Sequence, residues 1–168
     1  MNPLLLALLL AVLLSPIHAA ADILRGHVVG VTDGDTITLL DAAMTQHKIR
    51  VAGIDAPEKK QPFGQRSKES LSALAYDKDL SIEWTKKDRY GRIVGKLIDR
   101  HGRDINLEQI RTGMAWHYKK YNKEQSPEDR DLYAAAEVAA RGKRVGLWSD
   151  TNPEAPWDYR KAKRDEGE

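Results

Sequence analysis

The chain has 168 residues, of which 41% are hydrophobic and 31% are charged, with a formal net charge of +2 and no cysteine. This length suits one ordinary domain with a real core. The lack of cysteine excludes a disulfide scaffold, a thiolate metal site and a cysteine-linked lipid anchor. The mildly basic charge permits a nucleic-acid or phosphate ligand without arguing for one, so such evidence must come from a local site.

The N-terminus has the pattern of a secretory signal peptide. An apolar stretch runs from Leu4 to Leu14 and is followed by Ser15, Pro16 and small residues at 19–21. A bilayer span needs about 20 apolar residues, so residues 1–21 are predicted to be a cleaved signal peptide. No Lys or Arg precedes the apolar stretch, which leaves a retained anchor as the alternative. We therefore expect an exported protein, periplasmic or secreted, with no membrane contact after cleavage.

The remaining chain alternates between strand-like and helix-like patterns. Alternating apolar and polar residues predict strands over 25–31, 35–40, 47–54, 80–85 and 93–99. Helical spacing predicts a helix over 65–76 between the third and fourth strands. Two more helices are expected, one with Asn106 as its N-cap and one that begins at Ser126-Pro127.

This order of elements predicts the fold class. Five short strands fit a small closed barrel better than an open sheet, because closure removes exposed edges. A helix between strands three and four is the insertion expected of an OB-fold. We therefore predict a mainly β (α+β) domain over residues 22–149, a five-stranded OB-fold barrel with three helices. Residues 150–168 are predicted to be a charged, mostly mobile tail in which Trp157 docks.

The segment VTDGDTITL contains an aspartate in an unusual place. Asp33-Gly34 is a strong hairpin signal between two strands. Counting by twos along the second strand, Asp35 shares a face with Ile37 and Leu39. If those two residues face a core, a carboxylate is aimed at that core or its rim. Ionised acids are rarely left there without a partner, so Asp35 is expected to have one.

Three further motifs complete a set of charged residues. Arg50 lies in KIRVAG, Asp55 and Glu58 lie in IDAPE, and Arg92 lies in DRYGR. Two aspartates at strand ends, without His or Cys nearby, suit calcium or magnesium rather than zinc. Arginines beside such a site can hold phosphate oxygens, and Glu58 is a candidate base for an attacking water. Together, these residues indicate metal-assisted phosphoryl transfer to water.

Each of these residues also has a simpler explanation when taken alone. Asp33 suits the turn, and Asp35 could cap or pair locally. Arg92 could be a solvated residue after a turn, and Glu58 could belong to a charged loop. Only their joint order and spacing favour a catalytic site.

The motifs DGDT, IRVAGIDAPE, DRYGR, GMAWHYKKY and GLW resemble those of the staphylococcal nuclease (thermonuclease) family. The resemblance covers roughly residues 25–149, and the tail PWDYR at 156–160 is similar to tails of secreted bacterial members. It implies an OB-fold barrel with three helices and calcium-dependent hydrolysis of DNA and RNA. The resemblance also implies that the hydrolysis proceeds by attack on the phosphorus with departure of the 5′-oxygen.

The resemblance also implies roles for individual residues. The calcium carboxylates fall on Asp35 and Asp55, and a backbone carbonyl ligand falls on Ala56. The arginines that clamp the phosphate fall on Arg50 and Arg92.

Other family positions fall nearby. Glu58 matches the residue that serves the attacking water, and Tyr90 and Tyr121 match tyrosines near the nucleotide. Lys119 replaces an aromatic residue, so base stacking is expected to be weaker or differently placed.

We therefore predict a calcium-dependent phosphodiesterase, a nuclease acting on DNA and RNA with low sequence specificity. A monomer without a stable protein partner is expected. The alternative is a non-catalytic OB-fold nucleic-acid-binding module, since fold alone does not imply function. A degenerate copy should have lost part of the charged set, which is complete here. A structural or inhibitory exported protein would leave Asp35 without a partner.

Overall fold

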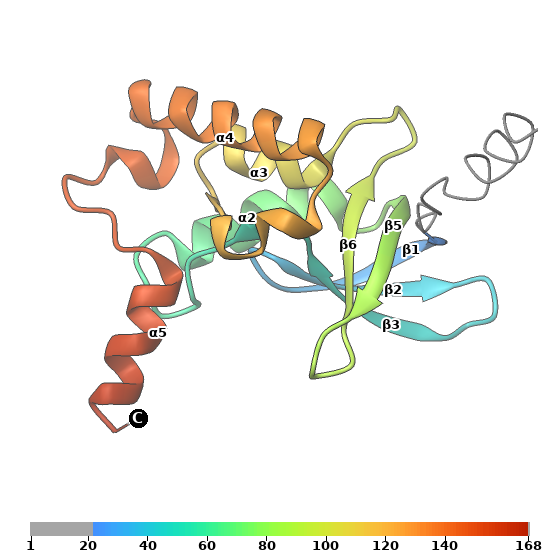
Figure 1. Ribbon diagram of the computed structural model, residues 1–168. Helices are drawn as coiled ribbons and strands as arrows, with labels where there is room; N and C mark the ends of the chain where they lie inside the picture. Colours follow the sequence, from blue (N-terminus) through green and yellow to red (C-terminus); the bar gives the residue numbers. More distant parts are fainter. Residues whose placement is uncertain (1–21, 168) are drawn as a thin grey trace, which may run out of the picture.

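The computed structural model describes residues 22–167, so the predicted signal peptide lies outside the described residues. Figure 1 shows a β-barrel with helices gathered at one side, and a C-terminal helix that projects away from them. Between residues 22 and 167 no helix is long and apolar enough to cross a membrane.

Five strands close the barrel in the order β1-β2-β3-β6-β5. Their bounds are β1 Asp22–Asp33, β2 Thr36–Asp41, β3 Gln46–Val51, β5 Asp79–Lys87 and β6 Ile93–Ile98. β3 and β6 run parallel, and the other neighbouring pairs are antiparallel. The predicted five-stranded OB-type barrel is confirmed.

The third strand is shorter than predicted. β3 ends at Val51, and the chain turns at Gly53, where φ is 72°. It then enters the two-residue strand β4 (Ile54–Asp55), which pairs with β7 (Trp116–His117) outside the barrel. This break directs Asp55 away from the barrel sheet.

Three helices occupy the predicted places: α2 Gly64–Ala75, α3 Ile105–Arg111 and α4 Pro127–Gly142. Two 3₁₀ helices, η1 (Lys119–Glu124) and η2 (Gly146–Ser149), flank α4. The Ser126 cap of α4 is confirmed, because its side chain accepts a hydrogen bond from the Asp129 N–H.

The predicted cap of α3 is wrong. Asp104 is the N-cap and accepts from the Leu107 N–H at 3.0 Å. Asn106 is instead fully buried, where its side chain accepts from the Leu97 N–H and donates to the Ala52 carbonyl. A buried amide that satisfies barrel backbone groups contributes more there than it would at a helix end.

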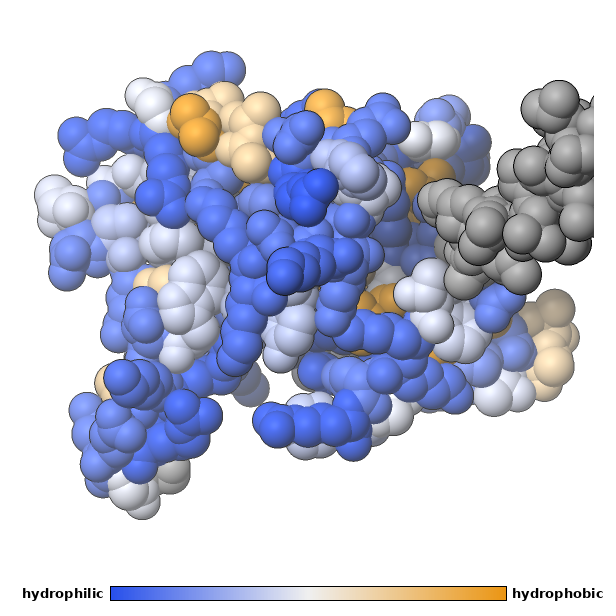
Figure 2. Space-filling view, viewed as in Figure 1, coloured by the Kyte–Doolittle hydropathy of each residue, from blue (hydrophilic) through white to orange (hydrophobic). Residues whose placement is uncertain are grey.

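The predicted mobile tail contains a fourth helix, α5 (Pro156–Asp165). Pro156 stands at its start, Asp158 lies in the first turn, and basic residues lie in the last turn, which all favour helix formation. Trp157 docks as expected, against Trp116 and Tyr118. In Figure 2 the α5 region stands out as a largely hydrophilic lobe.

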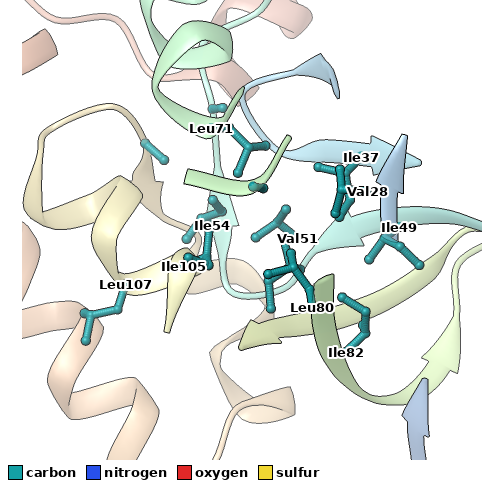
Figure 3. Close-up of a cluster of buried hydrophobic side chains, with 14 of the residues drawn as sticks. Val28, Ile37, Ile49, Val51, Ile54, Leu71, Leu80, Ile82, Ile105 and Leu107 are labelled. Carbon is teal, nitrogen blue, oxygen red and sulfur yellow. The ribbon is translucent and has the colours of Figure 1, made fainter. Parts of the chain in front are cut away.

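The hydrophobic core fills the barrel and continues under α2 and α3. Ile37, Leu39, Ile49, Ile82 and Leu97 are all fully buried inside the barrel. Figure 3 shows Leu71 of α2 reaching toward this group from outside the barrel. The interior of the barrel and the inner faces of α2 and α3 therefore form one continuous core.

Gly34, at the tip of the β1–β2 hairpin, lies directly against the helices. A Cβ atom at this position would overlap the Ser67 hydroxyl of α2 and press on the Ala56 side chain. The Gly34 carbonyl accepts from Gln109 Nε2 at 3.0 Å. The hairpin tip, and with it the start of β2, is thus held between α2 and α3.

Gly34→Ala is therefore expected to lower the free energy of unfolding by about 1–3 kcal/mol, because the added methyl group overpacks this contact. The matched control is Gly30→Ala in β1, where a Cβ would lie 3.6 Å from Thr38, an ordinary contact. Urea unfolding measures both variants. Equal unfolding midpoints would contradict the close contact at Gly34.

Candidate active site

Asp35 lies in the turn immediately before β2 and points to the rim of the core, as predicted. It is 7% exposed, while Ile37 and Leu39 are fully buried. Its Oδ2 accepts from the Ala56 N–H at 2.8 Å and lies 3.2 Å from Nη2 of Arg50. The partners of this carboxylate are therefore a guanidinium, a backbone N–H and the Thr36 hydroxyl, which donates to Oδ1 at 3.2 Å.

Arg50 of β3 joins the two predicted carboxylates. The register places it opposite Thr36, next to the start of β2. Its Nη2 donates to Asp55 Oδ1 at 2.9 Å, and the same nitrogen lies 3.2 Å from Asp35 Oδ2. Its Nη1 donates to the carbonyls of Val51 and Ile54. One guanidinium thus fixes both aspartates and the backbone turn between β3 and β4.

The carboxylates of Asp33, Asp35 and Asp55 together carry more negative charge than Arg50 alone neutralises. Burial and the nearby charge of Asp35 raise the pKa of Asp33 to about 6. Burial also raises the pKa of Asp55, which is 1% exposed, although the neighbouring arginines oppose this shift. Such shifts arise where the charged form lacks sufficient stabilisation. The charged forms of Asp33 and Asp55 are therefore only partly stabilised by the groups around them.

The donor atoms fit a hard cation. Asp35 and Asp55 offer only oxygen, the ligand that calcium and magnesium prefer. Across residues 22–167 no cluster of three or more His, Cys, Asp or Glu side chains is placed to hold a metal. Water, a backbone carbonyl or the substrate would have to complete the coordination sphere.

Glu58 joins the group through a residue that sequence reasoning missed. Arg160 of α5 donates through Nη1 to Glu58 Oε1 and through Nη2 to Asp55 Oδ2, both at 2.7 Å. A sequence signal for this contact exists. Proline at a helix start and cations at its end predict a helix at 156–165, and i,i+3 spacing then places Trp157 and Arg160 on one face.

Arg92 and Tyr90 lie together in the β5–β6 turn. Arg92 Nε donates to Asp88 Oδ2 at 2.8 Å, and its guanidinium lies 5.6 Å from the centre of the Tyr90 ring. Tyr90 is 69% exposed. In the described part of the chain no hydrogen bond or ion pair joins Arg92 to Asp35 or Asp55. Its role as a phosphate clamp stays a prediction.

Tyr121 lies in η1, on the side of the molecule where α5 docks. Its ring packs against Tyr118 at 5.1 Å and is flanked by the cations of Lys86 and Lys120. Lys119, which replaces a family aromatic residue, pairs with Glu137 at 2.7 Å. Exposed rings beside cations are suited to nucleic acid, and the substrate role of Tyr121 stays a prediction.

The chain is similar to proteins named as nucleases and endonucleases. The family described as staphylococcal nuclease homologue matches residues 48–150. A protein of Haemophilus influenzae named an uncharacterized endonuclease is 41% identical over 137 residues, which cover 82% of this chain and 73% of that protein. The protein named micrococcal nuclease of Shigella flexneri is 38% identical over 161 residues, 91% of this chain and 89% of its own length.

A third relative, named protein ParB, of Escherichia coli, is 39% identical over 172 aligned positions, covering 96% of this chain and 93% of that protein. The family match begins within β3 and includes Asp55 and Glu58 but not Asp35, whereas the match to protein ParB covers nearly the whole chain. With its closed barrel and its paired aspartates around Arg50, the chain belongs to the staphylococcal nuclease homologue family.

Proposed function

We propose that this protein is a calcium-dependent nuclease that hydrolyses phosphodiester bonds of DNA and RNA with low sequence specificity. The observation that carries the proposal is the bridging of Asp35 and Asp55 by one guanidinium nitrogen of Arg50. Relatives named endonuclease and micrococcal nuclease support the activity class. We further propose that the protein acts after export, as a monomer.

Asp35 and Asp55, with the Ala56 carbonyl, are the residues that would hold calcium. A bound divalent cation supplies Lewis-acid stabilisation of phosphate charge and makes water more acidic. The carbonyl assignment is compatible with the structure, in which Ala56 uses its N–H to bind Asp35.

Proton transfer and stabilisation of the phosphate charge are assigned to Glu58 and Arg50. Glu58 accepts the proton of the attacking water as its oxygen bonds to phosphorus. The bond to the 5′-oxygen breaks, and that oxygen leaves with the electron pair and takes a proton from water. Arg50, which is held by two backbone carbonyls, faces the phosphate oxygens as negative charge develops on them. Because such contacts involve phosphate rather than base edges, they carry no sequence information.

Cleavage of supercoiled plasmid by the purified protein tests this function. Calcium, magnesium and a calcium chelator are compared, with Asp35→Ala beside the wild type. The matched control is Asp131→Ala, which removes an exposed carboxylate from α4. We expect nicking that requires calcium, stops on chelation and falls at least about 100-fold in Asp35→Ala alone.

Circular dichroism verifies that each variant is folded. Folded wild-type protein that retards DNA on a gel but cuts it with neither metal would contradict the nuclease. That result would favour the non-catalytic nucleic-acid-binding module.

A further inference from the structure

Helix α5 brings an arginine into the candidate active site from the far end of the chain. Arg160 contacts Asp55 with both terminal nitrogens, at 2.7 and 3.3 Å, and Glu58 Oε1 at 2.7 Å. A planar guanidinium held by two carboxylates fixes the orientation of both, because its donors form a rigid fork.

Aromatic packing holds α5 in place for this contact. The Trp157 ring stacks on Tyr118 with centroids 5.5 Å apart and an interplanar angle of 11°. It also meets the edge of Trp116 at 5.4 Å. Trp157 and Arg160 are three residues apart and so lie on the same face of the helix. The docked indole therefore directs Arg160 toward the carboxylates.

A second link ties α5 to the loop that carries Glu58. Gln61 Nε2 donates to the Glu154 carbonyl at 2.7 Å, just before α5 begins. The Oε1 of the same Gln61 accepts from the Glu58 N–H at 3.1 Å. The backbone of Glu58 and the start of α5 are thus held by one side chain, which limits their relative displacement.

Glu58 needs such restraint if it serves as a base. Its side chain is 39% exposed, and in the described chain Arg160 is the residue whose side chain bonds to its carboxylate. A base must lie within hydrogen-bond reach of the proton that it accepts, and active bases are commonly oriented by a third group. Arg160 engages Oε1, and among the described residues no hydrogen bond to Oε2 is found.

We propose that Arg160 is a positioning residue of this active site, which orients the Glu58 carboxylate beside Asp55 for attack by water. The inference rests on the proposed nuclease function. It extends the site to α5, a segment beyond the residues matched by the family.

Steady-state plasmid cleavage by the full chain tests the proposal with three variants. Arg160→Gln removes the charge, Arg160→Lys keeps it but lacks the fork, and Arg164→Gln, in the exposed last turn of α5, is the control. We expect Arg160→Gln to lower kcat about 10–100-fold, as loss of a residue that orients an active-site group does. KM should change less than about threefold, and Arg160→Lys should recover part of kcat. Arg164→Gln should match the wild type.

A double-mutant cycle separates positioning from general structural damage. If Arg160 acts through Glu58, adding Arg160→Gln to Glu58→Gln should lower kcat no further than Glu58→Gln alone. Independent, multiplying losses would overturn the proposal, and so would wild-type kcat in folded Arg160→Gln.

Two measurements without turnover complete the test. Urea unfolding in chelator should show non-additive shifts of the midpoint for Arg160→Gln and Glu58→Gln, whether or not the wild type cuts DNA. Failure of the nuclease proposal is thereby distinguished from failure of the contact. Calcium titration calorimetry provides the second measurement. Calcium binding at least about tenfold tighter in Arg160→Gln, together with undiminished cleavage, would identify Arg160 as an occluding group and overturn the proposal.

Discussion

Glu58→Gln is expected to lower kcat for plasmid cleavage by about 10²–10⁴-fold, the range that a positioned general base contributes. Glutamine keeps the size of the side chain and can still accept a hydrogen bond from Arg160 through its amide oxygen. It cannot accept the proton of the attacking water. The loss should therefore appear in kcat, while plasmid binding and the far-UV spectrum stay as in the wild type.

The control for this variant is Glu83→Gln, which removes an exposed carboxylate from β5 without a contact in the active site. Its kcat should equal that of the wild type. A Glu58→Gln enzyme that retains more than about one tenth of wild-type kcat would show that another group, or solvent, takes the proton.

Arg50→Lys is expected to reduce kcat/KM by about 10²–10³-fold, comparable with the loss of one donor that stabilises a developing oxyanion. The positive charge is kept, but a single ammonium cannot reproduce the guanidinium fork. In the wild type, Nη1 of Arg50 donates to two backbone carbonyls, and Nη2 reaches both aspartates. Lysine should satisfy only part of this set, so both the phosphate contact and the spacing of the carboxylates should suffer.

Arg25→Lys is the matched control, since Arg25 is exposed on β1. Kinetics are measured with both variants after urea unfolding has shown that each is folded at the assay temperature. Near-wild-type kcat/KM in Arg50→Lys would mean that charge alone suffices at this position, and that the fork geometry contributes nothing to the reaction.

Local sequence patterns predicted most of the barrel and the helices around it. Alternation of apolar residues located the five barrel strands, because side chains on successive strand residues point to opposite faces. The same counting showed that Asp35 points inward beside Ile37 and Leu39, and both neighbours are fully buried. The cap at Ser126 was also predictable, since its hydrogen bond is formed within a few residues.

Local patterns failed where a distant contact outweighed the local one. Asn106 matched a capping pattern, yet barrel backbone groups at Leu97 and Ala52 take its side chain, and Asp104 caps α3 instead. The tail was expected to be mostly mobile because of its charge. The tail instead contains a helix, α5, whose Trp157 stacks on Tyr118, a residue distant in the sequence.

Residue types and spacings were enough to predict the strand and helix periods, the inward direction of Asp35 and a site with oxygen ligands and neighbouring arginines. Each of these follows from residue types and short spacings. The packing of distant elements was needed to show that one nitrogen of Arg50 reaches both aspartates, that Arg92 pairs with Asp88 in its own turn, and that Arg160 contacts Asp55. Arg160 and Glu58 are 102 residues apart, and a contact at that separation depends on how the packed elements bring the chain together.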